Sequence, residues 1–171
     1  TEYFKSDFAS DEERAAYEDA LCAQVEAEGA ALLKNDNAAL PLASGAKVSL
    51  FGHGSVDLMY GGTGSGSVDT SKAPSFKQAL ESQGITVNET LWNLYSSDDM
   101  MKNYSRVTPA AISDTLEANT QYAVNEAPWS KLSGAESSFA EYGDAAIVVL
   151  SRSGGEGADL PSGENGTNDS W

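Results

Sequence analysis

Apolar residues near the start of the chain recur at near-helical spacing, with acidic residues between them. The repeating positions are Tyr17, Leu21, Val25 and Leu32. This spacing predicts a helix over about residues 11–33. Ser10 and Glu13 have the spacing of a capping box, so we expect Ser10 to begin the helix. Residues 1–10 are expected to form an extended arm, and residues 40–45 a connector.

Short apolar runs later in the chain have the length of buried strands. The runs cover residues 48–51, 85–87 and 147–150. Before the second run, Ser71 and Pro74 predict a helix with proline at an early helical position, and Gly84 suits its C-terminal cap. After that run, Asn88 is expected to cap a further helix that extends to about residue 104.

The alternation of strands and helices predicts an α/β fold, with a mostly parallel sheet flanked by helices. We expect residues 11–171 to form a single domain. In such sheets, ligands bind at the C-terminal ends of the strands, where the winding order switches. Two glycine-rich stretches, 61–66 and 154–157, follow strand ends. If their strands are neighbours, the two loops face one crevice.

Composition limits the possible partners and cofactors. The formal net charge of −16 argues against nucleic acid and against an anionic membrane surface, because both would repel the chain. The single cysteine, Cys22, allows no disulfide within the chain, and it is expected as a small core residue. The single histidine argues against a His-based zinc site, so we expect neither metal nor cofactor. No signal-peptide pattern opens the chain, which favours a cytoplasmic location.

The glycine-rich loop at 61–66 does not have the sequence of a phosphate-binding loop. Gly61 and Gly66 have Walker A spacing, but Ser67 stands where that motif requires lysine. The dinucleotide-binding pattern also fails, because Asp57 occupies the position of its third glycine. Such a loop suits a neutral, hydroxyl-rich ligand, which backbone groups can approach closely. A plain flexible turn is the alternative.

Glu156 lies among glycines after the last strand, and it is the candidate acid. If a partner surface covers it, desolvation would raise its pKa towards the working pH. Arg152 could hydrogen-bond to a ligand or fix the loop, and Asp159 is a further acid nearby. His53 could donate to a ligand hydroxyl. A solvated glutamate and a local histidine contact are the alternatives, and one carboxylate does not make a glycosidase.

Several blocks of sequence together resemble the α/β sandwich domain of glycoside hydrolase family 3, which includes β-glucosidases. The blocks are residues 28–36 (EGAALLKND), 40–42 (LPL), 47–52 (KVSLFG), 61–66 (GGTGSG) and 149–161 (VLSRSGGEGADLP). They cover most of the chain in the family's order, with looser agreement between 88 and 140.

The resemblance implies a retaining, exo-acting β-glycosidase that hydrolyses a β-linked glucoside or oligosaccharide. In that family, a (β/α)8 barrel domain supplies an aspartate nucleophile, and the sandwich domain supplies the general acid/base, here Glu156. The implied substrate-binding residues are Gly61, Gly62, Thr63, Gly64, Ser65, Arg152, Asp159 and His53.

The chain also departs from the family's pattern, because no barrel is present. It is similar to members in which the sandwich precedes the barrel, and we expect a partial domain that is inactive alone. A partial parallel sheet should leave an unpaired edge, which we expect to pair with another copy of the chain. A non-catalytic carbohydrate-binding or scaffold module is the alternative function.

Overall fold

The computed structural model describes residues 6–60, 69–104, 106–107, 123–124 and 126–151. The chain divides between Leu42 and Ala43 into two compact units, and each is described by itself. The single domain expected from residue 11 onward stays a prediction.

The first unit contains helix α1 (Asp11–Gly29) and the 3-10 turn η1 (Asp36–Ala38). Ser10 begins α1 as predicted, because its Oγ accepts a hydrogen bond from the Glu13 N–H. The helix ends at Gly29, earlier than predicted, because the backbone becomes extended at Ala30. No side chain of α1 is buried, and Cys22 is therefore exposed rather than in a core.

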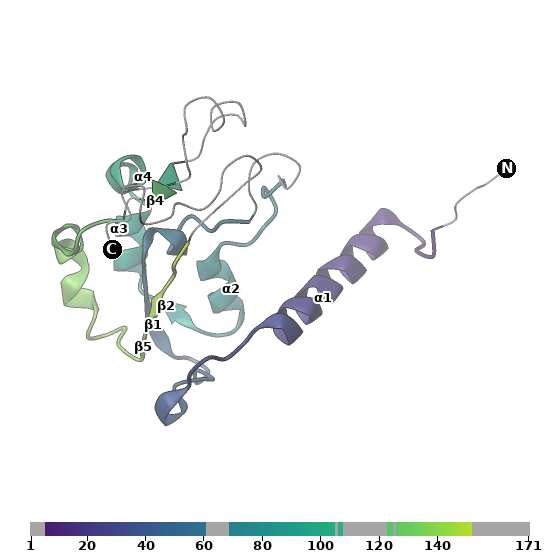
Figure 1. Cartoon of the computed structure of the whole chain (residues 1–171), viewed down its shortest axis with the longest axis horizontal. Helices are drawn as coiled ribbons and strands as arrows, with labels where there is room; N and C mark the ends of the chain where they lie inside the picture. Colours follow the sequence, from purple (N-terminus) through teal and green to yellow (C-terminus); the bar gives the residue numbers. More distant parts are fainter. Residues whose placement is uncertain (1–5, 61–68, 105, 108–122, 125, 152–171) are drawn as a thin grey trace, which may run out of the picture. The chain divides into compact units, whose positions relative to one another are not determined.

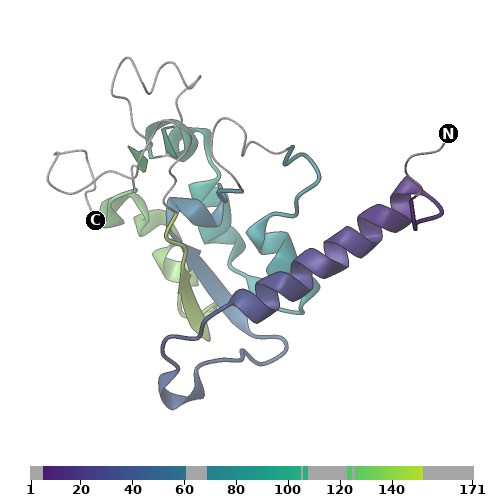
Figure 2. The ribbon, with the colours of Figure 1, turned by 45° about the vertical axis from the view of Figure 1, so that its right-hand side comes forward.

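The second unit is built on a parallel sheet of three strands among the described residues. The strands are β1 (Lys47–Phe51), β2 (Thr86–Val87) and β5 (Ala145–Val148). Their order is β2-β1-β5, so β1 is central and both neighbours run parallel to it. Figure 2 shows β5 alongside β1. The predicted α/β fold with a parallel sheet is confirmed.

The sheet has helices on both faces, with α2 (Phe76–Ser82) on one side and α3 (Glu89–Tyr95) on the other (Figure 1). The chain passes from β1 to β2 through α2, and from β2 to β5 on the far side of β1 through α3. The order of winding therefore switches between β1 and β5. This is the position at which parallel α/β sheets bind ligands.

Shorter elements complete the described part of this unit. They are η2 (His53–Ser55), α4 (Asp98–Asn103), η4 (Trp129–Lys131), η5 (Ser133–Ser138) and an antiparallel pair, β3 (Arg106–Val107) with β4 (Ala123–Val124).

Two helix boundaries differ from those expected from the sequence. Helix α2 is capped by Ser75 in a capping box with Gln78, so Pro74 precedes the cap instead of lying in the first turn. The predicted helix from Asn88 to about residue 104 is two helices, α3 and α4. The reason is Ser97, whose Oγ accepts the Met100 N–H and starts a new helix.

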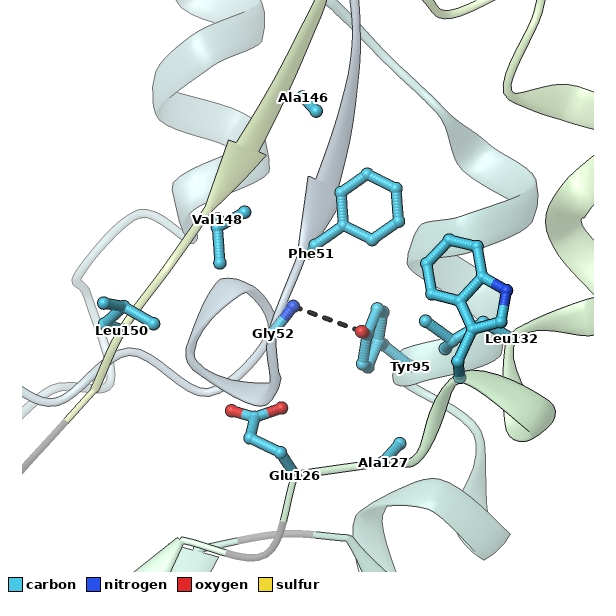
Figure 3. Close-up of a pocket in the computed structure, with 10 residues that line it drawn as sticks. Phe51, Gly52, Tyr95, Glu126, Ala127, Leu132, Ala146, Val148 and Leu150 are labelled. Atoms are coloured by element: carbon cyan, nitrogen blue, oxygen red, sulfur yellow. Dashed lines mark hydrogen bonds between the residues drawn. The ribbon is translucent and has the colours of Figure 1, made fainter. Parts of the chain in front are cut away.

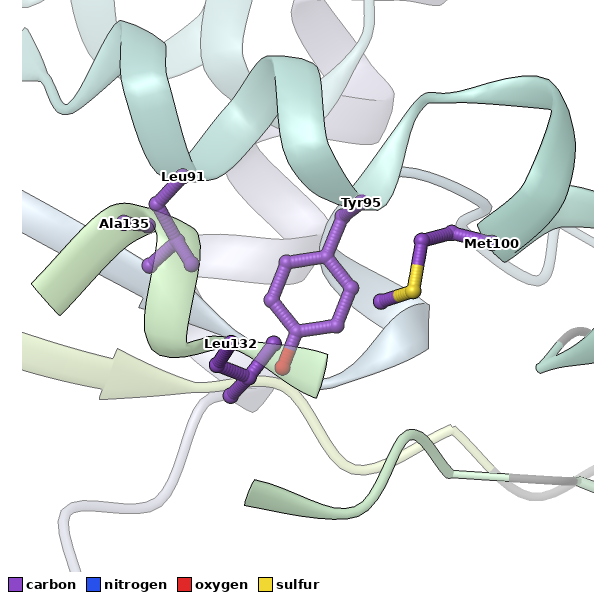
Figure 4. Close-up of a cluster of buried hydrophobic side chains, with 5 residues drawn as sticks. All are labelled: Leu91, Tyr95, Met100, Leu132 and Ala135. Atoms are coloured by element: carbon purple, nitrogen blue, oxygen red, sulfur yellow. The ribbon is translucent and has the colours of Figure 1, made fainter. Parts of the chain in front are cut away.

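The core lies on both faces of β1. Val48 and Leu50 are fully buried, and Val48 pairs with the buried Val87 of β2. On the opposite face, a cluster joins α3 and α4 to η5 and the residue before it (Figure 4). Its buried members are Leu91, Tyr95, Met100, Leu132 and Ala135.

Asn88 connects β1, α3 and η5 through its buried side chain, which is 0% exposed. Its Oδ1 accepts the Leu91 N–H and caps α3 as predicted. Its Nδ2 donates to Ser49 Oγ at 3.1 Å and to Ser138 Oγ at 2.8 Å. One side chain therefore starts a helix and ties it to the central strand.

We predict that Asn88→Ala lowers the free energy of unfolding by about 2–4 kcal/mol, because it removes both a helix cap and buried hydrogen bonds. Urea unfolding of the 171-residue chain measures this value. Ser75→Ala is the matched control, since Ser75 caps α2 from a less buried position, and it should cost about 1 kcal/mol. Equal costs for the two variants would contradict the linking role of Asn88.

Strand β5 is an edge of the described sheet, and large apolar side chains at its end and just after it are exposed. Val148 is 61% exposed and Leu150 is 67% exposed. Strands of parallel sheets are normally covered on both faces. An uncovered apolar edge strand is a site for pairing with another chain.

We therefore expect the 171-residue chain to self-associate, and Val148→Lys to shift it towards monomer, because lysine on an edge strand opposes pairing. Sedimentation velocity at several concentrations measures this shift. Val25→Lys is the control, since Val25 of α1 is 62% exposed but lies outside the sheet. A monomeric, cooperatively melting wild-type chain would contradict the prediction.

Candidate functional site

The candidate site lies at the C-terminal ends of β1 and β5, where the winding order switches. After β1 the chain turns through η2, and after β5 it continues to Ser151. Most of the residues predicted from the sequence lie outside the described residues. They are Gly61, Gly62, Thr63, Gly64, Ser65, Arg152, Glu156 and Asp159. Their roles stay predictions, but β1 and β5 are neighbours, as the proposed crevice requires.

Gly52 and Gly54 let the turn after β1 lie directly against the end of β5. A Cβ on Gly52 would lie 2.6 Å from the Val149 carbonyl oxygen, and one on Gly54 would lie 2.7 Å from the Ser151 Cβ. Gly52 also has a φ of 89°, which disfavours other residues. The two glycines are therefore explained by close packing of two strand ends rather than by nucleotide binding.

His53 lies in this turn, and its side chain is buried. Its Nε2 lies 3.1 Å from Asp57 Oδ2, which is the local contact that the sequence left open. His53 is only 1% exposed to solvent. A direct contact between its ring and a ligand stays a prediction.

Glu126 belongs to the same site, although no local pattern in the sequence marks it. Its two carboxylate oxygens accept the backbone N–H of His53 at 3.0 and 2.9 Å. The two residues lie 73 positions apart, so only the fold brings them together. The nearest sequence signal is Pro128-Trp129, which indicates a turn but gives no role to the glutamate before it.

Tyr95 joins the core to the site. Its Oη accepts the Gly52 N–H at 3.2 Å, and its side chain is buried. Burial raises the pKa of the Tyr95 phenol above its usual value, and the Glu126 carboxylate raises it further, whereas the hydrogen bond from Gly52 opposes both. The phenol, which an ordinary tyrosine pKa already keeps neutral at pH 7, therefore stays neutral to a more alkaline pH than usual.

A hollow of about 430 Å³ lies beside these groups (Figure 3). Apolar side chains of β5 form one wall, and the carboxylate of Glu126 points towards the turn after β1. The lining residues are Phe51, Gly52, Tyr95, Glu126, Ala127, Trp129, Leu132, Ala146, Val148 and Leu150. The ring of Phe51 stacks on Trp129 and meets the edge of Phe139.

The described lining contains no lysine or arginine, so it offers no counter-charge to a phosphate. Among the described residues, no group of three His, Cys, Asp or Glu side chains could hold a metal ion. No described helix has the length and apolar character needed to cross a membrane. A carboxylate, a neutral phenol and apolar walls suit a neutral or hydroxyl-bearing ligand better than a phosphate.

Comparison with known proteins gives the chain a family. Residues 30–169 match the model of the glycosyl hydrolase family 3 C-terminal domain. This match covers most of the sequence and includes both glycine-rich stretches.

Two known proteins support the match. β-Glucosidase A of Butyrivibrio fibrisolvens is 32% identical over 141 residues, which are 81% of this chain and 15% of that protein. The structure of β-glucosidase 3B from Thermotoga neapolitana in complex with α-D-glucose superposes with a TM-score of 0.61 at 27% identity. That alignment covers 88% of this chain and 20% of the other. The chain thus spans a small part of both relatives, and it belongs to glycosyl hydrolase family 3 through the family's C-terminal domain.

Proposed function

We propose that this chain is the acid/base-carrying domain of a retaining, exo-acting β-glycosidase of the β-glucosidase type. The parallel pairing of β1 with β5 carries the proposal, because the strands that precede the two glycine-rich stretches in the sequence end at the same edge of the sheet. A (β/α)8 barrel domain of the same enzyme would supply the nucleophile.

A β-linked glucoside or oligosaccharide is the proposed substrate. Both relatives are named as β-glucosidases, and the solved one was determined with α-D-glucose. The absence of cationic side chains from the described lining supports a neutral ligand over a phosphorylated one. Backbone groups of Gly61–Ser65, together with Arg152 and Asp159, would hydrogen-bond the sugar hydroxyls. For His53, whose ring contacts Asp57, we propose a contribution through the turn that it occupies.

The proposed reaction has two steps. Glu156 protonates the glycosidic oxygen while the barrel aspartate attacks the anomeric carbon, so the aglycone leaves as an alcohol and a glycosyl-enzyme ester forms. The Glu156 carboxylate then removes a proton from water, which attacks the anomeric carbon and releases the sugar and the aspartate. Glu156 ends protonated and ready for the next cycle.

We predict that Glu156→Gln in the full-length enzyme lowers kcat/KM by about 10²–10⁴-fold for substrates with poor leaving groups, because these need protonation. Activated aryl glucosides, whose leaving groups need little protonation, should lose much less. Steady-state kinetics across a series of leaving groups measures the difference. Glu164→Gln is the control, since Glu164 follows Glu156 in the sequence and has no proposed role. Equal losses on both substrate classes would contradict the acid role.

We also predict that the 171-residue chain alone hydrolyses no aryl β-glucoside, because it lacks the proposed nucleophile. A discontinuous assay at high protein concentration tests this, and detectable turnover would contradict it. A titration with glucose compares the wild type with Glu156→Ala. Binding that is unchanged by the substitution would favour a non-catalytic carbohydrate-binding module.

A further inference from the structure

We propose that Glu126 is a positioning residue that fixes the turn after β1 against the end of β5. It thereby sets where the chain enters the segment that carries Glu156. This inference rests on the proposed function for its catalytic consequence. Its structural part stands on described residues alone.

The turn is held from outside by two side chains that are distant in sequence. The Gly52 N–H donates to Tyr95 Oη, and the next N–H, that of His53, donates to both oxygens of Glu126. The N–H groups of Gly52 and His53 are thus oriented by side chains from two different places, α3 and the segment before η4. Because a carboxylate accepts more strongly than a neutral oxygen, Glu126 provides the stronger of these two contacts.

The turn also closes on itself. Ser55 Oγ donates to the Gly52 carbonyl at 2.8 Å, and the Ser55 N–H donates to the same carbonyl at 3.0 Å. The buried His53 ring contacts Asp57 across the next turn. Residues 52–57 therefore respond together when their outer contacts change.

There is little free space between this turn and β5. The positions of a Cβ on Gly52 and on Gly54 lie within 2.7 Å of Val149 and Ser151 atoms, well inside normal contact distance. In addition, the Val149 N–H donates to the Phe51 carbonyl at 2.9 Å, which fixes the end of β5 to the start of the turn. A displacement of the turn therefore displaces Ser151, the residue before Arg152 in the sequence.

Glu126 makes no salt bridge with any side chain in the described part of the chain. Its described polar contact is the pair of hydrogen bonds from His53. Glu126 is partly buried, and it accepts a backbone N–H instead of pairing with a cation. Such a hydrogen bond fixes the orientation of the peptide group more than it contributes electrostatic attraction between charges. This favours a positioning role over a purely stabilising ion pair.

The catalytic consequence is tested in the full-length enzyme with Glu126→Ala and Glu126→Gln. Displacing an acid by about 1 Å can cost about 10²-fold in rate. We expect Glu126→Ala to lose about 10–100-fold in kcat/KM for poor leaving groups and at most a few-fold for activated aryl glucosides, because kcat/KM reports the first step, in which the leaving group is protonated. Glu126→Gln keeps a carbonyl acceptor for the His53 N–H and should recover most of the loss.

Glu141→Ala is the matched control, because Glu141 is an acid that contacts Lys47 at the opposite end of β1. It should leave the leaving-group dependence unchanged. If Glu156→Gln shows the expected dependence but Glu126→Ala affects all substrates equally, or none, the positioning role is wrong. If Glu156→Gln itself shows no such dependence, the proposed function is what fails.

The structural part has its own measurement, which does not depend on activity. Amide hydrogen exchange of the 171-residue chain should be about ten-fold faster or more at His53 in Glu126→Ala, because the amide loses its acceptor. Exchange at Val149, whose N–H donates to the Phe51 carbonyl, should also become faster, while exchange at Thr86 in β2, whose N–H donates to the Ala46 carbonyl, should not change. A change confined to His53, or a uniform change across the sheet, would overturn the coupling to β5.

Discussion

The parallel pairing of β1 with β5 is the constraint on which the described site depends. Its register sets Phe51 opposite Val148, so both strands end at the same level of the sheet. The turn after β1 then has to pass close to Val149 and Ser151, and only residues without a Cβ fit there. A side chain at Gly52 or Gly54 would force the strand ends apart, and the site would lose the geometry on which the proposed chemistry relies.

This pairing is supported by the layers on either side of the sheet. Val48 and Leu50 fill one face of β1, while Ser49 turns to the other and meets Asn88 at the start of α3. The same helix carries Tyr95, which packs in the core cluster and accepts the Gly52 N–H. The side chain of Tyr95 therefore belongs both to the core and to the site. A change in the packing of the core cluster would alter the position of the turn after β1.

The acidic residues of the chain as a whole differ in role from the one carboxylate described in the site. The 26 acidic residues outnumber the 10 basic ones and give the chain its net charge of −16. In the site, by contrast, the carboxylate of Glu126 accepts the His53 N–H, and burial raises the pKa of the Tyr95 phenol. The Glu126 carboxylate is thus held in one orientation by its hydrogen bonds, and apolar side chains line the hollow beside it. Such surroundings favour a neutral, hydroxyl-bearing ligand, which supports the proposed substrate.

The sequence by itself determined the features that depend on local chemistry. The strand at 48–51, the caps at Ser10 and Asn88 and the alternation behind the α/β fold could be predicted because each involves residues close together in the chain. The break at Ser97 was missed although the sequence contains its signal, because Ser97 followed by Asp98 and Asp99 is typical of a helix N-terminus. Tertiary structure alone decided that β1 and β5 are neighbours, that Gly52 and Gly54 serve close packing, and that Glu126 joins the site. Each of these contacts links segments tens of residues apart, and backbone N–H groups find such partners only once the sheet and its helices have assembled.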